Sequence, residues 1–99
     1  MEALAVLADP TRRAIVDGLI DGPEDAGTIA ARFPVSRPAI SRHLRVLREA
    51  GLVRSETIAQ RRVYHVELEP LREVDEWLSK YRSFWADRLD RLETHLEEN

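Results

Sequence analysis

The last third of the chain carries one helical repeat of apolar residues that is too long for so small a protein to bury. From Pro70 onward, apolar residues recur every three or four positions, the spacing of one face of an α-helix. The stripe consists of Leu71, Val74, Leu78, Tyr81, Trp85, Leu89, Leu92 and Leu96, widened by Trp77 and Phe84. A helix over about residues 70–96 would span about 40 Å, more than the rest of a 99-residue chain can cover. The stripe predicts a homodimer interface, and the alternative is a helix that wraps around its own domain.

Residues 36–50 form a second amphipathic segment, whose outer face is basic. Ser36 is placed to cap a helix over about residues 37–50, and Pro38 is tolerated in the first turn. Apolar residues at helical spacing share one buried stripe, namely Ile40, Leu44 and Leu47. The opposite face carries Ser41, Arg37, Arg42, Arg45 and Arg48. A helix anchored on one side and offering guanidinium groups on the other suits the major groove of DNA, although a solvated surface helix has the same pattern.

Charge is segregated along the chain, and this segregation says more than the net charge of −3. Residues 36–65 carry seven Arg against two Glu, a net charge of +5. The segments on either side hold more acidic than basic residues, so this basic block is the part that would attract phosphate. All seven of its cations are Arg, whose planar guanidinium bonds phosphate or guanine through two N–H groups at once.

Two capped helices are predicted before the basic segment, after a short helix within residues 1–7. Asp9 caps the first, with Pro10 in its first position. Its inward stripe is Ile15, Val16, Leu19 and Ile20, and Gly22-Pro23 ends it. Asp25 caps the second, whose inward residues are Ile29, Ala30 and Phe33. Pro34 closes this helix, and the basic helix follows after a tight turn, which is the spacing of a helix-turn-helix.

Residues 52–68 contain two strand-like runs rich in β-branched and aromatic residues, which predict a β-hairpin. Gly51 is available for a left-handed cap that ends the preceding helix. Residues 59–61 connect the strands, and the register is open by a residue or so because the turn lacks Asn-Gly or Asp-Gly. A hairpin directly after a DNA-reading helix is a wing, predicted over about residues 53–68. Arg61 and Arg62 at its tip are candidates to contact a phosphate or an adjacent minor groove.

This order of elements resembles the ArsR-type winged-helix repressors over nearly the whole chain. The resemblance is carried by residues 8–15, residues 35–47 with their Ser-x-His-Leu-x-x-Leu core, and Gly51-Leu52-Val53. The Trp-containing terminal helix is similar to the metal-free branch of that family. The resemblance implies one mainly α-helical domain over residues 1–99 with a small β-hairpin. It also implies a homodimer that binds double-stranded DNA at an inverted-repeat operator and blocks transcription, often of its own operon.

Carried over by position, the resemblance assigns roles to individual residues of this chain. Those offered to base edges would be Arg37, Pro38, Ala39 and Ser41. Those holding phosphates would be Ser36, Arg42, His43 and Arg45, with Arg61 and Arg62 as the wing contacts. Arg48 is expected on a solvated face. The residues of the dimer interface would be Leu4, Leu7, Leu78, Tyr81, Trp85, Leu89 and Leu92.

The resemblance also raises a metal hypothesis, because some members of that family sense metals. One of their sites is a Cys cluster, and this chain contains no Cys. The other lies on the last helix, where His95 and Glu98 have the spacing of one half of it, but the other half would fall near Arg82 and Phe84. Half a site leaves zinc without its usual four ligands, so we expect no metal and no cofactor. A metal-responsive repressor that uses the last helix is kept as an alternative.

Composition and motifs also bear on whether the chain is an enzyme, whether it binds another protein instead of DNA, and where in the cell it acts. An enzyme is not expected, because the chain has no nucleophile-base-orienter set and no glycine-rich phosphate loop. The nearest rival is a winged-helix module that binds another protein. The clustering of the seven Arg in one segment argues against this alternative. With no Cys, no long apolar run and no signal-peptide pattern, we expect a cytoplasmic protein. Whether the aromatic residues of the last helix line an effector pocket or pack in a core is left open.

Overall fold

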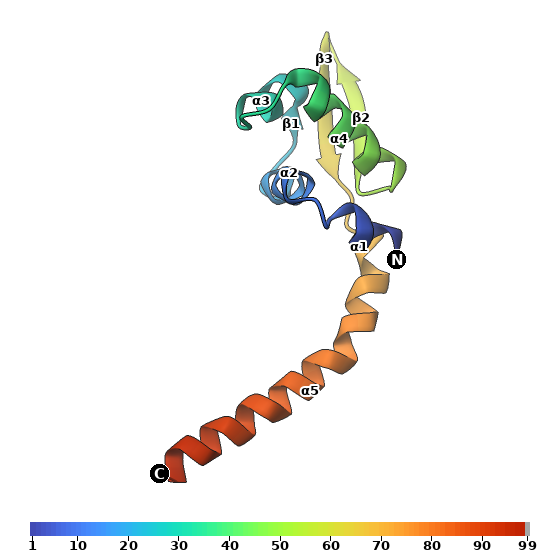
Figure 1. Cartoon of the computed structure of the whole chain (residues 1–99). Helices are drawn as coiled ribbons and strands as arrows, with labels where there is room; N and C mark the ends of the chain where they lie inside the picture. Colours follow the sequence, from blue (N-terminus) through green and yellow to red (C-terminus); the bar gives the residue numbers. More distant parts are fainter. Residues whose placement is uncertain (99) are drawn as a thin grey trace.

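The computed structural model describes residues 1–98, the last of them for its backbone alone. The N-terminal part contains α1 (Glu2–Val6), α2 (Pro10–Ile20), the short strand β1 (Glu24–Asp25) and α3 (Ala26–Ala31). These are followed by α4 (Arg37–Glu49), β2 (Val53–Ile58), β3 (Arg61–Val66) and α5 (Leu71–Glu98). The predicted mainly helical fold with a hairpin and a long last helix is confirmed (Figure 1). The last helix begins one residue after Pro70, which the sequence had placed inside it.

Side-chain caps start three of the helices at the residues that the sequence predicted. The Asp9 carboxylate accepts hydrogen bonds from the backbone N–H groups of Thr11 and Arg12, at 2.8 and 3.1 Å. The Asp25 carboxylate accepts one from Thr28 at 2.8 Å, at the start of α3. The Ser36 hydroxyl accepts one from Ala39 at 3.2 Å, at the start of α4. Each cap satisfies an N–H group that has no partner within its own helix.

The core lies where α2, α3 and α4 meet the inner face of the hairpin. Its fully buried side chains are Ile15, Leu19, Ile29, Ile40, Leu47 and Leu52. Tyr64 of β3 and Val74 of α5 complete the same cluster from the wing and from the last helix. Ile20, expected in the inward stripe of α2, is instead 55% exposed, so that part of the prediction is wrong. It lies at the end of α2, beyond the part of the helix that the core covers.

The sheet has three antiparallel strands in the order β1-β3-β2. Ile58 pairs with Arg61, so the turn consists of Ala59 and Gln60 alone, and Arg61 belongs to β3 rather than to the predicted connection. Ala59 has a φ of 57°, a left-handed conformation that this tight turn imposes on a residue other than glycine. Strand β1 was not predicted, because two residues are too few to show alternation. After α4, Gly51 adopts a φ of 75° and forms the predicted left-handed cap.

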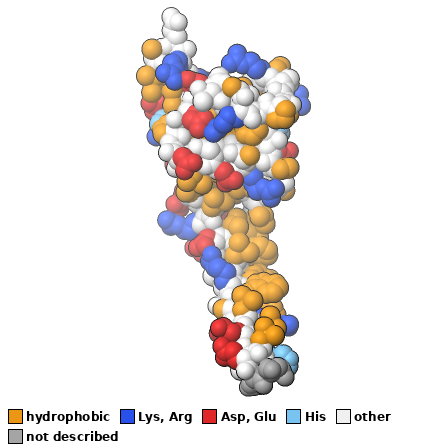
Figure 2. All heavy atoms as spheres, turned by 90° about the vertical axis from the view of Figure 1, so that its left-hand side faces the viewer, with side chains coloured by type: hydrophobic (Ala, Val, Ile, Leu, Met, Phe, Trp, Pro, Cys, Tyr) orange, Lys and Arg blue, Asp and Glu red, His pale blue; other side chains and the backbone are white. Residues whose placement is uncertain are grey.

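Helix α5 leaves the domain and projects from it as a rod (Figure 1). The Cα radius of gyration is 18.2 Å, against about 13 Å for a compact domain of this length. Val74 is the last buried side chain of this helix among the described residues, and the apolar residues from Leu78 to Leu96 are exposed. Figure 2 shows them as a continuous hydrophobic strip along one side of the rod, with charged side chains beside it. The helix therefore does not wrap around its own domain.

Candidate nucleic-acid interface

Helix α4 turns its basic face to solvent, as the sequence predicted. Its apolar stripe is buried in the core, with Leu47 0% exposed and Ile40 and Leu44 each 2% exposed. On the outer face the exposed residues are Ser36, Arg37, Pro38, Ser41, Arg42 and Arg45. Ala39 and His43 are half-buried at the edges of this face. Anchoring by three buried residues holds the basic face as a rigid surface, which a helix that reads DNA requires.

The arginines of α4 differ from many of the others in having no carboxylate partner. Elsewhere, Arg32 pairs with Glu24 at 2.8 Å, and Arg54 pairs with Glu67 at 2.7 Å. Within residues 1–98, no ion pair is formed by Arg37, Arg42, Arg45 or Arg48. Several positive charges on one face without a compensating carboxylate create a positive potential that attracts phosphate.

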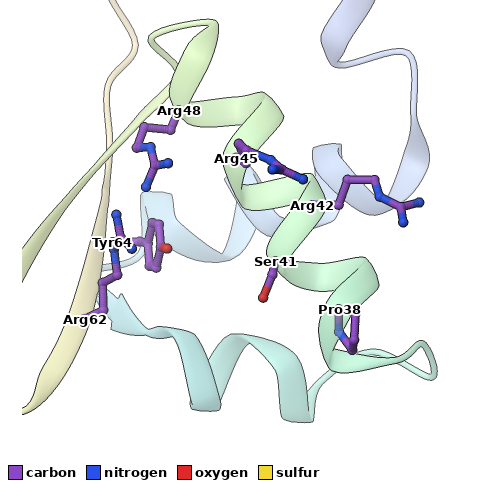
Figure 3. Close-up of a pocket in the computed structure, with 7 residues that line it drawn as sticks. All are labelled: Pro38, Ser41, Arg42, Arg45, Arg48, Arg62 and Tyr64. Atoms are coloured by element: carbon purple, nitrogen blue, oxygen red, sulfur yellow. The ribbon is translucent and has the colours of Figure 1, made fainter.

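A hollow lies where α4 meets the wing (Figure 3). It is lined by Pro38, Ser41, Arg42, Arg45, Arg48, Arg62 and Tyr64. Five of these seven were predicted DNA contacts, and the structure brings helix and wing contacts together in one place. Arg48, which was expected on a solvated face, is half-buried and faces the hollow. The sequence did not identify Tyr64 as a residue of this hollow. Alternation along a strand predicts whether a ring faces the core, but it does not predict where the hydroxyl of that ring points.

Arg61 does not stand free at the tip of the wing, as the sequence suggested. Its guanidinium contacts the Asp25 carboxylate through Nε, at 3.0 Å, and through Nη2. The same carboxylate caps α3, so one side chain joins the wing to the first helix of the helix-turn-helix. The backbone N–H of Thr28 and the guanidinium of Arg61 together lower the pKa of Asp25 to about 2. Arg62, one residue further on, has no carboxylate partner among the described residues and faces the hollow.

His43 is directed toward α2 rather than toward the exposed face of α4. Its Nδ1 lies 3.4 Å from Nη1 of Arg12, whose Nε donates to the backbone carbonyl of Val6 at 2.7 Å. The pKa of the neighbouring Asp9 carboxyl is lowered, chiefly because the backbone N–H of Arg12 donates to it. His43 therefore links α4 to α2, and its contact with a phosphate stays a prediction.

Arg37 lies close to the preceding helix, at the start of α4. A Cβ atom added to Gly27 of α3 would sit 3.1 Å from Nη2 of Arg37, so the absence of a side chain at Gly27 leaves room for the guanidinium. A smaller hollow between α3 and α4 is lined by Ala26, Ala30, Arg37, Ile40, Ser41 and Leu44. The predicted reader of bases thus rests over α3, and its role in reading a base stays a prediction.

The predicted dimer residues lie on one surface that runs from the domain onto the rod. Leu4 and Leu7 line an apolar groove together with Ala8, Arg13, Val16, Asp17, Ile20, Leu71 and Val74. The groove joins α1 and α2 to the start of α5, so its floor continues into the exposed strip of that helix. Trp77 packs edge-on against Tyr81 with ring centroids 5.3 Å apart, yet both rings are exposed, so these aromatics do not form a core within one chain.

No group of three or more His, Asp or Glu side chains that could hold a metal ion is found in the part of the chain that the structure describes. His95 lies within that part, whereas the side chain of Glu98 lies outside it. None of the described helices combines the length and the hydropathy needed to cross a membrane.

Together these elements define a winged helix-turn-helix. Helices α3 and α4 are its two helices, and the β2–β3 hairpin that follows is its wing. The basic outer surface of α4 stands beside the wing, and a hollow lined by both elements joins them. Proteins of this class place the second helix in the major groove of duplex DNA.

Comparison with known proteins places the chain within this class. The family model described as a helix-turn-helix domain matches residues 7–56. The HTH-type transcriptional regulator Rv2034 of Mycobacterium tuberculosis is 51% identical over 65 residues, which cover 66% of this chain and 61% of that protein. The transcriptional repressor SdpR of Bacillus subtilis is 35% identical over 75 residues, covering 76% of this chain and 83% of that protein.

Solved structures agree over almost the whole chain, the last helix included. A protein described as a "possible transcriptional regulator for arsenical resistance" is 42% identical, with a TM-score of 0.73 and 96% of both chains covered. An ArsR family transcriptional regulator is 30% identical, with a TM-score of 0.76 over 86% of this chain and 88% of its own. The chain belongs to the ArsR-type family of winged helix-turn-helix transcriptional regulators.

Proposed function

We propose that this protein is a dimeric repressor that binds duplex DNA at an inverted-repeat operator. The observation that carries the proposal is the basic face of α4, whose Arg37, Arg42, Arg45 and Arg48 have no carboxylate partner in the described chain. Three of them, Arg42, Arg45 and Arg48, line the hollow beside the wing. A major groove about 12 Å wide admits such a helix, and its guanidinium groups match guanine edges and phosphates. The exposed residues of this face, above all Arg42 and Arg45, supply the phosphate contacts. Membership of a family that includes a transcriptional repressor supports the direction of regulation.

The dimer part of the proposal rests on surface area. A compact protein of 99 residues exposes about 5,800 Å², whereas the described chain exposes 7077 Å². The excess of about 1,300 Å² exceeds the roughly 800 Å² per partner of a standard stable interface. Much of it is the apolar strip from Leu78 to Leu96. Two copies joined along this strip and the groove beside α1 would present their α4 helices to two half-sites about 34–36 Å apart.

We propose further that the protein acts by binding alone, without catalysis and without a resident cofactor. The absence of Cys and of any nucleophile-base set in the sequence supports this part. A DNA partner, together with relatives from bacteria, supports a site of action in the cytoplasm.

The test is a fluorescence anisotropy titration on duplexes selected from a random pool, carried out over a series of salt concentrations. We expect specific duplexes to compete above background, with affinity falling steeply as salt rises. Arg42→Ala should weaken binding to all duplexes and reduce the salt slope by about one. The matched control is Arg82→Ala, which removes the same charge from an exposed position on α5 that pairs with Asp75. If no duplex competes above non-specific background, the protein-interaction module is the correct function.

A further inference from the structure

The hollow between α4 and the wing holds positive charge without a counterion. Figure 3 shows the guanidinium groups of Arg48, from the last turn of α4, and Arg62, from β3, directed toward one another. No carboxylate side chain is among the residues that line the hollow. Arg42 and Arg45 line it too, although Figure 3 shows their guanidinium groups turned away from the wing. Two facing cations repel each other. An anion bound between them would attract both, and this attraction would outweigh the repulsion.

The floor of the hollow carries a hydroxyl group without a partner. Tyr64 is only 6% exposed and its ring belongs to the core, yet Figure 3 shows its hydroxyl directed into the hollow. No hydrogen bond of this hydroxyl is found among the described residues. The hydroxyl oxygen is not one of the fully buried polar atoms without a partner in the described chain, so solvent reaches it in the hollow and its O–H is available to a ligand there. A ligand in the hollow would supply a partner by accepting a hydrogen bond from the phenolic O–H.

Arg62 is held in place before any ligand arrives. Its Nε donates to the Ser55 hydroxyl at 3.2 Å, and its Cζ lies 5.9 Å from the centre of the Tyr64 ring. Side-chain entropy is therefore already lost, while the terminal N–H groups of this guanidinium face the hollow. Ser41 of α4 directs its hydroxyl into the same space. The site thus offers charged and neutral donors from two elements to one small anion.

We propose that Arg48, Arg62 and Tyr64 form a site for one phosphate group. A phosphate group can accept from two guanidinium groups and a hydroxyl at once, because even the two charged oxygens of a phosphodiester carry several lone pairs, and its tetrahedral shape directs them to different sides. The inference rests on the proposed function, since the phosphodiester backbone of bound DNA is one source of this group. A free phosphate is the other source. A phosphate held here contacts α4 and the wing together, and so fixes the depth of the helix in the groove relative to the wing.

The first experiment measures DNA affinity over a salt series for Arg48→Ala, Tyr64→Phe and the control Arg72→Ala. Arg72 is exposed at the start of α5 and pairs with Glu69, so its variant loses the same charge far from the hollow. Arg48→Ala should weaken binding to all duplexes and reduce the salt slope by about one. Tyr64→Phe keeps the buried ring and removes no charge, so affinity should fall about tenfold with the slope unchanged. Thermal unfolding of each variant shows that the fold is retained.

The second experiment locates the phosphate. Backbone phosphates of the selected duplex are replaced one at a time by neutral methylphosphonates. At one position in each half-site, the methylphosphonate should weaken DNA binding by the wild type. The same replacement should not weaken binding by Arg48→Ala any further, because that variant has already lost the contact. In parallel, inorganic phosphate is added to the DNA-free protein at constant ionic strength, and the arginine Nε–Hε NMR signals are followed. Saturable shifts of the Arg48 and Arg62 signals, reduced in Tyr64→Phe, would identify free phosphate as an occupant.

The outcomes separate this inference from the proposed function. If the wild type binds DNA normally while Arg48→Ala and Tyr64→Phe behave as Arg72→Ala does, and phosphate shifts neither arginine signal, the site is refuted and the function stands. If no duplex binds, the function fails, and the NMR titration alone decides whether the hollow takes phosphate. A methylphosphonate effect without NMR shifts assigns the site to the DNA backbone.

Discussion

Replacing Trp85 by alanine tests whether the exposed strip of α5 is the dimer interface. This side chain is 61% exposed in the single chain, so the change leaves the core of the domain intact. An aromatic side chain buries about 150–250 Å², so a partner would cover about 120 Å² of Trp85. At about 25 cal/mol per Å² this contributes about 3 kcal/mol per protomer. A two-fold interface contains the residue twice, so the dimer loses about 6 kcal/mol, which is an approximately 10⁴-fold rise in the dimer Kd.

Sedimentation equilibrium over a range of protein concentrations measures this dissociation constant directly. The matched control is Asp87→Ala, an exposed position on the opposite side of α5 from the strip. We expect the control to remain a dimer where Trp85→Ala sediments as a monomer, and the monomer to bind a full operator no better than a half-site. Equal dimer Kd values for the two variants would refute the argument from exposed area.

Three smaller predictions concern the domain itself. Leu47→Ala should lower the free energy of unfolding by about 2–5 kcal/mol, read from the urea midpoint, because the side chain is 0% exposed and a cavity would replace it. The pKa of Asp25 is about 2, below its ordinary 3.8, so the stability that its ionised form contributes above that ordinary value is lost as pH falls toward 2. Asp25→Asn should therefore flatten the loss of stability over this pH range in acid unfolding curves, and an unchanged curve would contradict the assignment. Arg61→Ala should reduce the salt slope of DNA binding less than Arg62→Ala does, because Asp25 already neutralises Arg61; equal slopes in the anisotropy assay would show that DNA displaces Asp25.

Much of the architecture is readable from short-range patterns. The caps at Asp9, Asp25 and Ser36 act on N–H groups two or three residues away, so the residues that start these helices are visible in the sequence. Periodicity within one helix likewise identified the buried stripe of α4 and the exposed strip of α5. The basic face of the candidate DNA interface follows from the same periodicity, because residues opposite a buried stripe must face solvent.

The corrections concern contacts between residues far apart in the sequence. Asp25 and Arg61 are 36 positions apart, and Arg12 and His43 are 31 apart. No local pattern encodes such a pair, because the packing of whole elements decides which side chains meet. The same packing brings Arg48 beside Arg62 and directs the Tyr64 hydroxyl into the hollow that they line. The sequence by itself thus determined which elements form and which faces are basic or apolar. Only the tertiary structure decided which arginines are neutralised by a carboxylate and which face a hollow that lacks one, because a charge is compensated through space and not along the chain.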